Sequence, residues 1–463
     1  MKILTHSQTL ISTFYSFPSQ LRAGARTALS ASLCSGSELR ADKAVRAPLA
    51  AFRHIFLFFV VISFLAEGPS SFAQGSLTPS SPPAAIMKTL DQIEPRTPVD
   101  AAHTPGNAIN AFIISQPGSY YLTGNVAVAS GSVIMIATND VTLDLNGFTI
   151  SSTASPAAGA AILLGSAIQD ATILNGHIKG NVIYSSGTYS GAGFLNGISY
   201  LSTNPPVNAR VSGVSVSGCA QFGINLGREY SSVVDRCHLR TIGSDGITAG
   251  QVSQCVVYYC GGNGIYCDTA FNCQGYSTGS GRGIYAAATA QNCHGNSNSG
   301  TGLDAVVAGN CLGQSTSGIG LNASTATGCT GTSSSGAGLN AITASGCYGT
   351  SSGATNGVAA AVTAACYGQS GSGIGVAAST AAHCFGQSSS GVGVNAGWVA
   401  ANSAGLSSTG IGLYANLPVF CEGASFDGVS YHTAGVSSAN VAIGCYGAGN
   451  PNQNATTRYL TPQ

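Results

Sequence analysis

Residues 320–337 read GLNASTATGCTGTSSSGA, and this stretch decides the fold because close copies of it recur on both sides. A glycine followed by an aliphatic residue recurs once in each copy, from Gly246-Ile247 to Gly412-Leu413. Two sets of landmarks with one period indicate a single structural unit that is copied along the chain. The second set is a ladder of cysteines 18 to 20 residues apart, at Cys219, Cys237, Cys255, Cys273, Cys293, Cys311, Cys329, Cys347, Cys366 and Cys384, which misses one beat at Asn402 and resumes at Cys421.

The repeat predicts short strands rather than helices. Around Cys329, residues of matching type recur in neighbouring units with separations of 2, 3, 3 and 2, which suits inward alternation along short strands broken by bends. A helix would need recurring steps of 3 and 4 over at least about ten residues, and the glycines disfavour one. We therefore expect a thin core lined by Leu321, Ala323, Ala326, Cys329 and Gly331.

The composition indicates one elongated, folded domain. Charged residues are 7% of the 463, hydrophobic residues are 44%, and the formal net charge is +0. Disorder requires low hydrophobicity together with high net charge, so the chain should fold. The repeat runs without a linker, which favours a single domain over two or three.

The first 73 residues differ in kind from the repeat. A twelve-residue apolar run at 55–66 follows Lys43, Arg46 and Arg53 and precedes Ala73, which is typical of a secretory signal peptide cleaved after Ala73. Residues 1–73 are thus predicted as a signal peptide with a long n-region, or with a mis-assigned start codon. A hydrophobic helix of the mature fold is the alternative. Export implies a secreted, periplasmic or cell-surface protein.

The rest of the chain divides by the regularity of its units. We predict a leader and a short capping helix at 74–104, longer irregular coils at 105–245, regular coils at 246–445 and a polar C-terminal tail at 446–463. In the irregular part, residues 111–114, 120–123, 133–136, 141–145 and 171–174 are predicted strands, and Asp140 and Asp170 open equivalent ones. The extra residues at 180–197 and 202–208 must leave the coils as loops.

Three features carry a resemblance to a known family. They are Pro117-Gly-Ser-Tyr-Tyr-Leu-Thr-Gly-Asn, then Asp140-Val-Thr-Leu-Asp-Leu-Asn-Gly-Phe-Thr-Ile, then the recurring glycine and cysteine columns. Over about 105–445 the chain resembles the pectin lyase-like superfamily. The resemblance implies an all-β, right-handed parallel β-helix with three short strands per coil. It also implies carbohydrate chemistry, since the family includes polysaccharide lyases and hydrolases. The family's catalytic motifs, an Asp-Asp pair, Asn-Thr-Asp with His-Gly, and Arg-x-Lys, are missing here.

The candidate ligand-binding residues lie on the irregular coils. If Cys237 and Leu239 face inward, the polar residues that alternate with them face outward along one strand. Planar polar groups and aromatic rings suit sugar rings, and arginines suit carboxylates or sulfates. A merely solvated face is the alternative. The candidates are Arg236, His238 and Arg240, followed on the next coils by Tyr258, Gln274, Tyr276 and His294.

The cysteines favour packing over chemistry. Twelve of the fifteen, from Cys219 to Cys445 without Cys260 and Cys267, sit on or near one column. Stacked parallel side chains keep their Cβ atoms about 4.8 Å apart, wider than a relaxed disulfide requires, so buried thiols are favoured. Cys260 and Cys267 are the best candidates for a disulfide. No Cys-x-x-Cys motif indicates a metal site, and no cofactor is predicted.

Charge limits the partners. Without residues 1–73 the chain has 9 Lys and Arg against 13 Asp and Glu, which leaves no basic patch for nucleic acid. From Ala305 onward the acids are Glu422 and Asp427, so this part should be chemically quiet. We predict a non-catalytic extracellular or cell-surface solenoid, structural or binding a polysaccharide or a cell-envelope glycan, with no stable membrane span in the mature chain. The alternative is a polysaccharide lyase or glycoside hydrolase that acts on an acidic polysaccharide.

Overall fold

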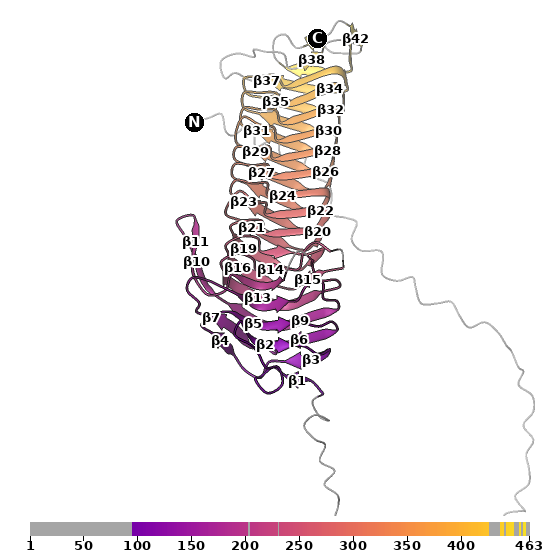
Figure 1. Ribbon diagram of the computed structural model, residues 1–463. Coiled ribbons are helices and arrows are strands. Elements are labelled where there is room, and N and C mark those ends of the chain that lie inside the picture. The colour runs from indigo at the N-terminus through magenta and orange to yellow at the C-terminus, as the bar shows by residue number, and fades with distance from the viewer. Residues whose placement is uncertain are drawn as a thin grey trace, which may run out of the picture. The chain divides into compact units, whose positions relative to one another are not determined.

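A parallel β-helix forms the described part of the protein (Figure 1). The computed structural model describes residues 95–201, 204–229, 231–425, 436–438, 441–448, 453–454 and 457–459. The predicted all-β parallel β-helix class is confirmed. The predicted signal peptide, leader and capping helix fall on residues 1–94, which lie outside the described residues. Within the described ranges, no helix is long and apolar enough to cross a membrane.

A regular coil consists of one long strand, a bend, one short strand and a closing turn, so it has two strands and not the three that the resemblance implies. β24 (Leu303–Gly309) is followed by Asn310, whose φ of 50° turns the chain, and then by β25 (Leu312–Ser315). The next long strand, β26 (Leu321–Thr327), pairs in parallel with β24 and brings Leu321 onto Leu303. Asn322 bonds to Asp304 on the coil below, 18 residues earlier, so the sequence period is the length of one coil.

The core of the regular coils is thin and made of small side chains. Leu321, Ala323, Ala326, Cys329 and Gly331 are all buried, as the repeat predicted. At Gly331, an added Cβ would lie 2.2 Å from the carbonyl oxygen of Gly338. The opposite walls of the coil therefore meet so closely that only glycine fits there.

A buried serine closes most of the turns between a short strand and the next long strand. Ser315 Oγ donates to the carbonyl oxygen of Gly300 at 2.7 Å and accepts from the backbone N–H of Gly318 at 2.8 Å. Ser333, Ser370, Ser388 and Ser407 repeat both bonds on their own coils. The serine thus supplies hydrogen-bond partners that a tight buried turn cannot find along its own backbone.

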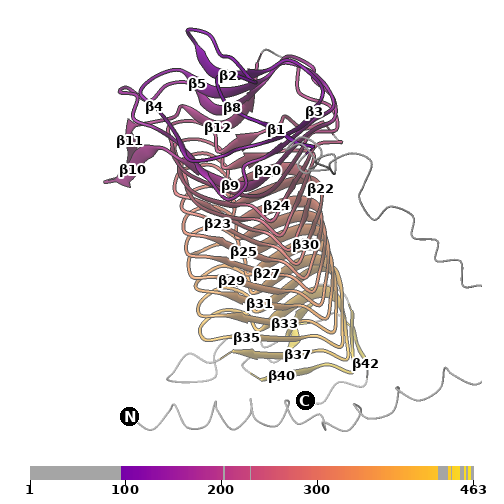
Figure 2. The ribbon, with the colours of Figure 1, turned by 90° about the horizontal axis from the view of Figure 1, so that it is seen from below.

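The N-terminal coils are longer and have larger cores, and Figure 2 shows them spreading wider than the coils behind. In one stack, β2 (Asn110–Ile114), β5 (Ser132–Ile136), β8 (Ala160–Leu164) and β12 (Asn196–Tyr200) lie in parallel register. Ile134, Ile162 and Ile198 are fully buried there. The predicted strands at 111–114, 133–136, 141–145 and 171–174 are confirmed in β2, β5, β6 (Val141–Asp144) and β9 (Ala171–Lys179), and the strand predicted at 120–123 overlaps β3 (Gly118–Tyr121).

Asp140 and Asp170 occupy equivalent places, as predicted. Val141 faces Ala171, and the two aspartates have φ values of 56° and 58°.

Residues 180–197, predicted as a loop, contain an ordered hairpin. β10 (Asn181–Ser185) and β11 (Thr188–Ala192) pair antiparallel around Ser186 and Gly187, whose φ values are 52° and 86°. Two positive φ values match the tight turn whose twist suits a β-hairpin. The hairpin projects from the side of the β-helix (Figure 1), where it approaches the candidate site.

The cysteine column is a row of buried thiols. Cys311 Sγ lies 3.2 Å from the carbonyl oxygen of Gly309 and 3.3 Å from that of Ala290, so its single S–H can donate to either, and other cysteines of the column repeat this pattern. The missing beat is filled by Ser403, whose Oγ donates to the carbonyl oxygen of Ala401 at 2.9 Å. These thiols therefore fill the core as small side chains and add weak contacts to carbonyl oxygens at the bend.

Two expectations about individual cysteines were wrong. Cys219 does not stand on the main column, because it lies in register with Ile242 and, one coil further, with Cys260. Cys260 and Cys267 form no disulfide and are separate buried thiols. They belong to different strands, β19 (Val256–Cys260) and β20 (Ile265–Phe271), and each faces the core from its own side of the coil. Sequence spacing alone could not show this.

Candidate functional site

The candidate site lies on the outer side of the short strands, which we call the short-strand face. It runs over β16 (His238–Ile242), β19, β21 (Gln274–Ser277), β23 (His294–Ser297) and β25, stacked in parallel. In β21, Gly275 and Ser277 are buried, which leaves Gln274 and Tyr276 facing out. Alternation along each strand therefore builds two outward columns, the first through Gln274 and the second through Tyr276.

A bulge places two adjacent tyrosines on this face. The register between β19 and β21 shifts between Val257 and Cys260, and Tyr259 has a φ of 57°. Thr241 on the coil below has a φ of 58°, so the irregularity is stacked on itself. The extra residue lets Tyr258 and Tyr259 both reach the surface, with exposed fractions of 44% and 39%.

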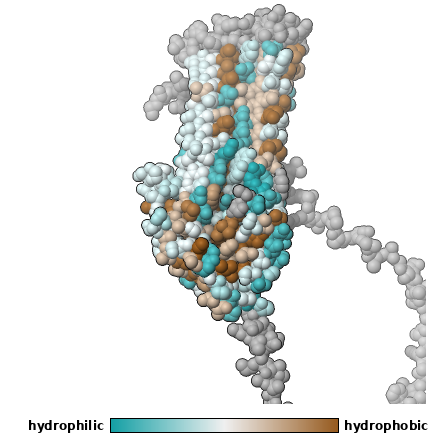
Figure 3. Space-filling view, in the orientation of Figure 1, coloured by the Kyte–Doolittle hydropathy of each residue, from teal (hydrophilic) through white to brown (hydrophobic). Residues whose placement is uncertain are grey.

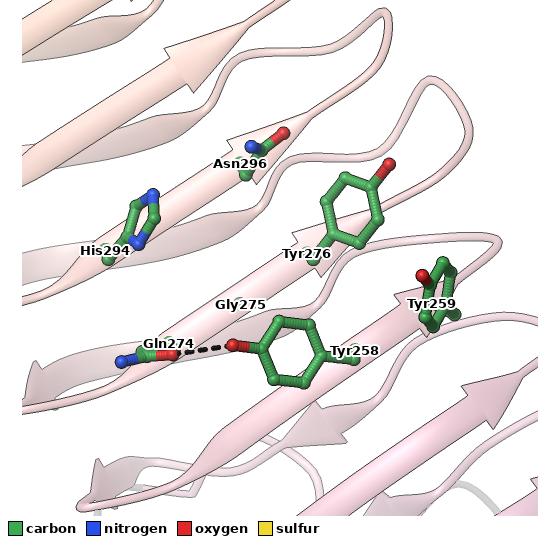
Figure 4. Close-up of a pocket in the computed structure, with 7 residues that line it drawn as sticks. All are labelled: Tyr258, Tyr259, Gln274, Gly275, Tyr276, His294 and Asn296. Atoms are coloured by element: carbon green, nitrogen blue, oxygen red, sulfur yellow. Dashed lines mark hydrogen bonds between the residues drawn. The ribbon is translucent and has the colours of Figure 1, made fainter.

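Seven residues from three successive coils surround an open pocket of about 220 Å³ (Figure 4). Its wall is aromatic on one side, from the rings of Tyr258, Tyr259 and Tyr276, and polar on the other. The full lining is Tyr258, Tyr259, Gln274, Gly275, Tyr276, His294 and Asn296.

The hairpin β10–β11 extends the aromatic wall. The rings of Tyr184 and Tyr259 lie 6.2 Å apart between centroids, and the rings of Tyr259 and Tyr276 meet edge to face at 5.6 Å. Tyr189 packs on Tyr184 at 4.8 Å, and its hydroxyl lies 2.8 Å from that of Thr278 on the β-helix. Four tyrosines from two distant segments thus form one continuous cluster.

Hydrogen bonds between coils fix the polar side chains. The Tyr258 hydroxyl donates to Gln274 Oε1 at 2.9 Å, as Figure 4 shows. Nε2 of His294 lies 3.0 Å from Oε1 of Gln314, which can only accept, so Nε2 carries the proton. In the neutral ring Nδ1 then keeps a lone pair. The site therefore presents oriented donors and acceptors beside its rings.

Burial moves the ionisation of two phenols in the cluster further from neutral pH. It raises the pKa of Tyr189 to about 12 and also raises the pKa of Tyr276. At physiological pH both hydroxyls remain protonated donors. A positive charge borders the cluster, because the guanidinium carbon of Arg240 lies 5.7 Å from the centroid of the Tyr259 ring, within cation–π range.

The structure brings most of the predicted site residues together. Tyr258, Gln274, Tyr276 and His294 line the pocket. His238 and Arg240 lie on the same face on the preceding coil, where Arg240 faces Tyr258 in register. Cys237 and Leu239 face inward, as expected.

Arg236 is the exception, because its side chain is exposed as expected but does not continue the row along the strand. Arg236 stands at a bend with a φ of 50°, before β16 begins. Its guanidinium contacts Asp235 at 2.6 Å and Ser212 at 3.1 Å instead of continuing the row. A strand alternation rule fails at this residue because the left-handed backbone turns its side chain toward the adjoining face.

The acids nearby in sequence are engaged elsewhere. Burial pushes the pKa of Asp235 up, but hydrogen bonds from Ser253 at 2.7 Å and from Arg236 outweigh it and hold the pKa below its usual range. Burial raises the pKa of Asp245, which accepts from the Asn263 backbone N–H at 2.6 Å. No carboxylate is among the described residues that line the pocket.

A second polar cluster lies on the long strands and was missed by sequence reasoning. Arg228 forms an ion pair with the buried Asp268 and stacks over the ring of Tyr266, with 4.8 Å from Cζ to the centroid. Arg282 stacks over Tyr285 at 4.6 Å and contacts Asp304 at 2.6 Å. Each guanidinium already has a carboxylate partner. The cluster therefore attaches the loop that carries Arg228 to the coils, and its guanidinium groups are already engaged by these partners.

Other members of the site were also missed. Strand alternation predicts that Tyr259 faces the core, so it is not among the predicted site residues. Asn296 is not among them either, although it lies on the same strand as His294. Tyr184 and Tyr189 were assigned to a loop, although Ser186-Gly187 between two β-rich segments is a hairpin signal. Among the described residues, no group of three or more His, Cys, Asp or Glu could hold a metal ion.

Comparison with known proteins gives little guidance. No family model matches the sequence, and no curated protein sequence matches it. Among solved structures, the chain is similar to the enzymatically active domain of tailspike protein 2 from bacteriophage CBA120, with 13% sequence identity and a TM-score of 0.34. The similarity covers 65% of this chain and 48% of that one, so this chain spans about half its length. A likeness this distant identifies neither a family nor an activity.

Proposed function

We propose that the protein is an exported solenoid that binds glycans, without catalysis, at the pocket on its short-strand face. One observation carries the proposal: aromatic rings and oriented amides converge there, with Tyr258, Tyr259 and Tyr276 beside Gln274 and Asn296. A sugar presents an apolar C–H face and a rim of hydroxyl groups. Rings suit the face, and amides can both donate to and accept from the rim.

The charges beside the pocket favour an acidic glycan. Arg240 is exposed at its border and retains donor groups around its planar guanidinium. A guanidinium can bind a carboxylate or a sulfate through two parallel hydrogen bonds. We therefore expect uronic-acid or sulfated chains to bind more tightly than neutral chains of equal length.

The lining supports binding more than hydrolysis. Glycoside hydrolysis generally uses two carboxyl groups placed on either side of the scissile bond. The described lining offers phenols, amides and an imidazole. These groups recognise a sugar without supplying that pair.

A glycan array tests the proposal. We expect Tyr259→Ala and Tyr276→Ala to weaken binding of the best acidic glycan at least about tenfold, because each removes a ring from the wall. Arg240→Ala should weaken acidic glycans and leave neutral ones unchanged. Tyr414→Ala is the matched control, since this half-buried tyrosine lies on β36 (Leu413–Val419), a long strand. Equal binding by the wild type and all four variants would refute the site.

A polysaccharide lyase is the second candidate, favoured by one observation. His294 lines the pocket and is held there through its Nε2, and an imidazole is a common base for proton abstraction, which beside a carboxylate also needs a cation such as Arg240. This reaction would release unsaturated sugars from an acidic polysaccharide. Their absorbance should stay at background with the wild-type protein if binding is the whole function. Turnover that His294→Ala or Arg240→Ala abolishes would establish the lyase instead.

A further inference from the structure

A second aromatic site lies on the same face, several coils further along the chain. Tyr348 on β29 (Tyr348–Ser351), Tyr367 on β31 (Tyr367–Ser370) and Phe385 on β33 (Phe385–Ser388) stack on one another. Their centroids lie 5.0 and 5.3 Å apart, with interplanar angles of 9° and 22°. Tyr348 is 38% exposed. We call these three rings the shaft platform.

The shaft platform continues the first outward column of the pocket. Strand register carries this column from coil to coil through Gln274, His294, Leu312, Thr330, Tyr348, Tyr367 and Phe385. The second column runs beside it through Tyr276, Asn296, Gln314, Thr332, Thr350, Gln369 and Gln387. Figure 3 shows residues of like hydropathy following the β-helix in such stripes. Pocket and platform are therefore two parts of one strip.

The platform repeats the construction of the pocket. In the pocket the Tyr258 hydroxyl donates to Gln274 of the next coil, and in the platform the Tyr367 hydroxyl donates to Gln387 of the next coil at 3.2 Å. In the pocket the glutamine lies in the first column, whereas in the platform the tyrosine lies there and the glutamine lies in the second. In both places a ring and an amide lie side by side. Two coils separate the two sites, and their outward residues on this strip, Leu312, Gln314, Thr330 and Thr332, carry no charge.

The stack is open at both ends. In register, Tyr348 is followed on one side by Thr330, and Phe385 on the other by Ala404. Because rings about 5 Å apart are offset rather than face to face, part of each ring surface also stays uncovered. Small neighbours and offset rings leave aromatic surface for a ligand.

The coil rise suggests what that ligand is. Neighbouring coils are about 4.8 Å apart, close to the length of one monosaccharide in an extended chain, so the six coil steps from Gln274 to Phe385 span about 29 Å. We propose that the shaft platform is a second subsite for the glycan bound in the pocket, and that one linear polysaccharide chain lies along the strip and contacts both. This inference rests on the proposed function and adds a chain-length requirement to it.

The test compares short and long glycans. The probes are linear acidic and neutral oligosaccharides on one array, each as trisaccharide and dodecasaccharide, against wild type, Tyr348→Ala/Tyr367→Ala, Phe385→Leu and Tyr414→Ala. Only a long chain reaches both sites, and linking two sites raises affinity without new contacts. We expect the double variant to weaken the dodecasaccharide at least about tenfold and to leave the trisaccharide unchanged. Phe385→Leu, which keeps apolar volume, should show the same pattern at smaller size.

The outcomes separate the two proposals. If Tyr276→Ala weakens binding of the trisaccharide, but the platform variants bind the dodecasaccharide like wild type, the second subsite is refuted and the pocket stands. If no glycan of either length binds wild type, both fail. A second copy of the chain could also cover the platform, and sedimentation velocity tests this. If the wild type is a dimer and the double variant is a monomer, the platform is a dimer interface and the inference is overturned.

Discussion

The size of single side chains sets the width of the regular coils. Ala326 is fully buried and lies in register between Ala308 and Ala344, which are buried as well. A column of methyl groups leaves little room between the walls of the coil, so volume matters more here than hydrophobicity.

Ala326→Leu should therefore destabilise the fold by about 1–3 kcal/mol, because the larger side chain overpacks the column. Thermal unfolding followed by circular dichroism measures the change. Thr325→Val on the same strand is the control, since Thr325 is exposed and its replacement should shift stability by less than about 0.5 kcal/mol. Equal melting temperatures for Ala326→Leu and wild type would mean that the core adapts without strain.

The buried thiols make stability depend on alkaline pH. Burial raises the pKa of Cys219 from 9.0 to about 12. The folded protein then keeps a proton that the unfolded chain releases, so the thiol's contribution is complete below pH 9 and is lost as the pH rises toward 12. One such thiol costs at most about 1.4 kcal/mol for each pH unit in this window.

Cys219→Val should flatten this decline. The variant should resemble wild type at neutral pH, because valine fills a similar apolar volume in contact with its register neighbour Ile242. Above pH 9 its melting temperature should fall less steeply than that of wild type. Parallel pH profiles for the two proteins would show that other groups control the alkaline transition.

At the scale of elements, the hairpin β10–β11 depends on the β-helix for its position. Its contacts with the coils are aromatic, through Tyr184 on Tyr259, and polar, through Tyr189 and Thr278. An isolated two-stranded hairpin is marginally stable in water. These contacts, together with the packing of β10 against β13 (Arg210–Cys219) and β16, therefore hold the hairpin beside the pocket.

Tyr189→Ala should release the hairpin. We expect faster proteolytic cleavage at Ser186 and Gly187, and weaker glycan binding because the aromatic wall loses support. Tyr189→Phe keeps the ring and loses only the hydrogen bond to Thr278, worth about 1 kcal/mol. Its cleavage rate should therefore lie between the rates of the wild type and Tyr189→Ala. Cleavage of Tyr189→Ala at the wild-type rate would show that the other contacts hold the hairpin without Tyr189.

At the scale of the molecule, each regular coil touches only its neighbours. Stability in such a solenoid is close to a sum of coil and interface contributions. One whole coil can therefore be removed, provided that the inward and outward positions of the remaining coils stay in register.

Deleting residues 320–337, one coil of 18 residues, should leave a cooperatively folded protein with a modestly lower melting temperature. Deleting Asn322 alone shifts Leu321 relative to Ala323 inside β26 and should disrupt folding, because a one-residue slip within a strand turns a core side chain outward. Circular dichroism and size-exclusion chromatography distinguish the two. Similar behaviour of both deletions would contradict the strict register that the cysteine column implies.

The sequence by itself determined the fold class, the coil length and the inward residues of the regular coils. The reason is that the alternation around Cys329 is local and is copied many times, so every copy confirms the same pattern of burial. It also placed Tyr258, Gln274, Tyr276 and His294 on one face, because residues one coil apart in a regular stack lie next to each other.

The tertiary structure decided what local patterns could not encode. The left-handed backbone at Arg236 removed it from the row, and the bulge at Tyr259 added a ring that alternation would have buried. The hairpin tyrosines reach the pocket from a segment far away in sequence. The candidate site thus depends on residues that depart from the repeat. Each departure occurs only once in the chain, so no repeated pattern predicts where that side chain lies, and only the folded structure shows it.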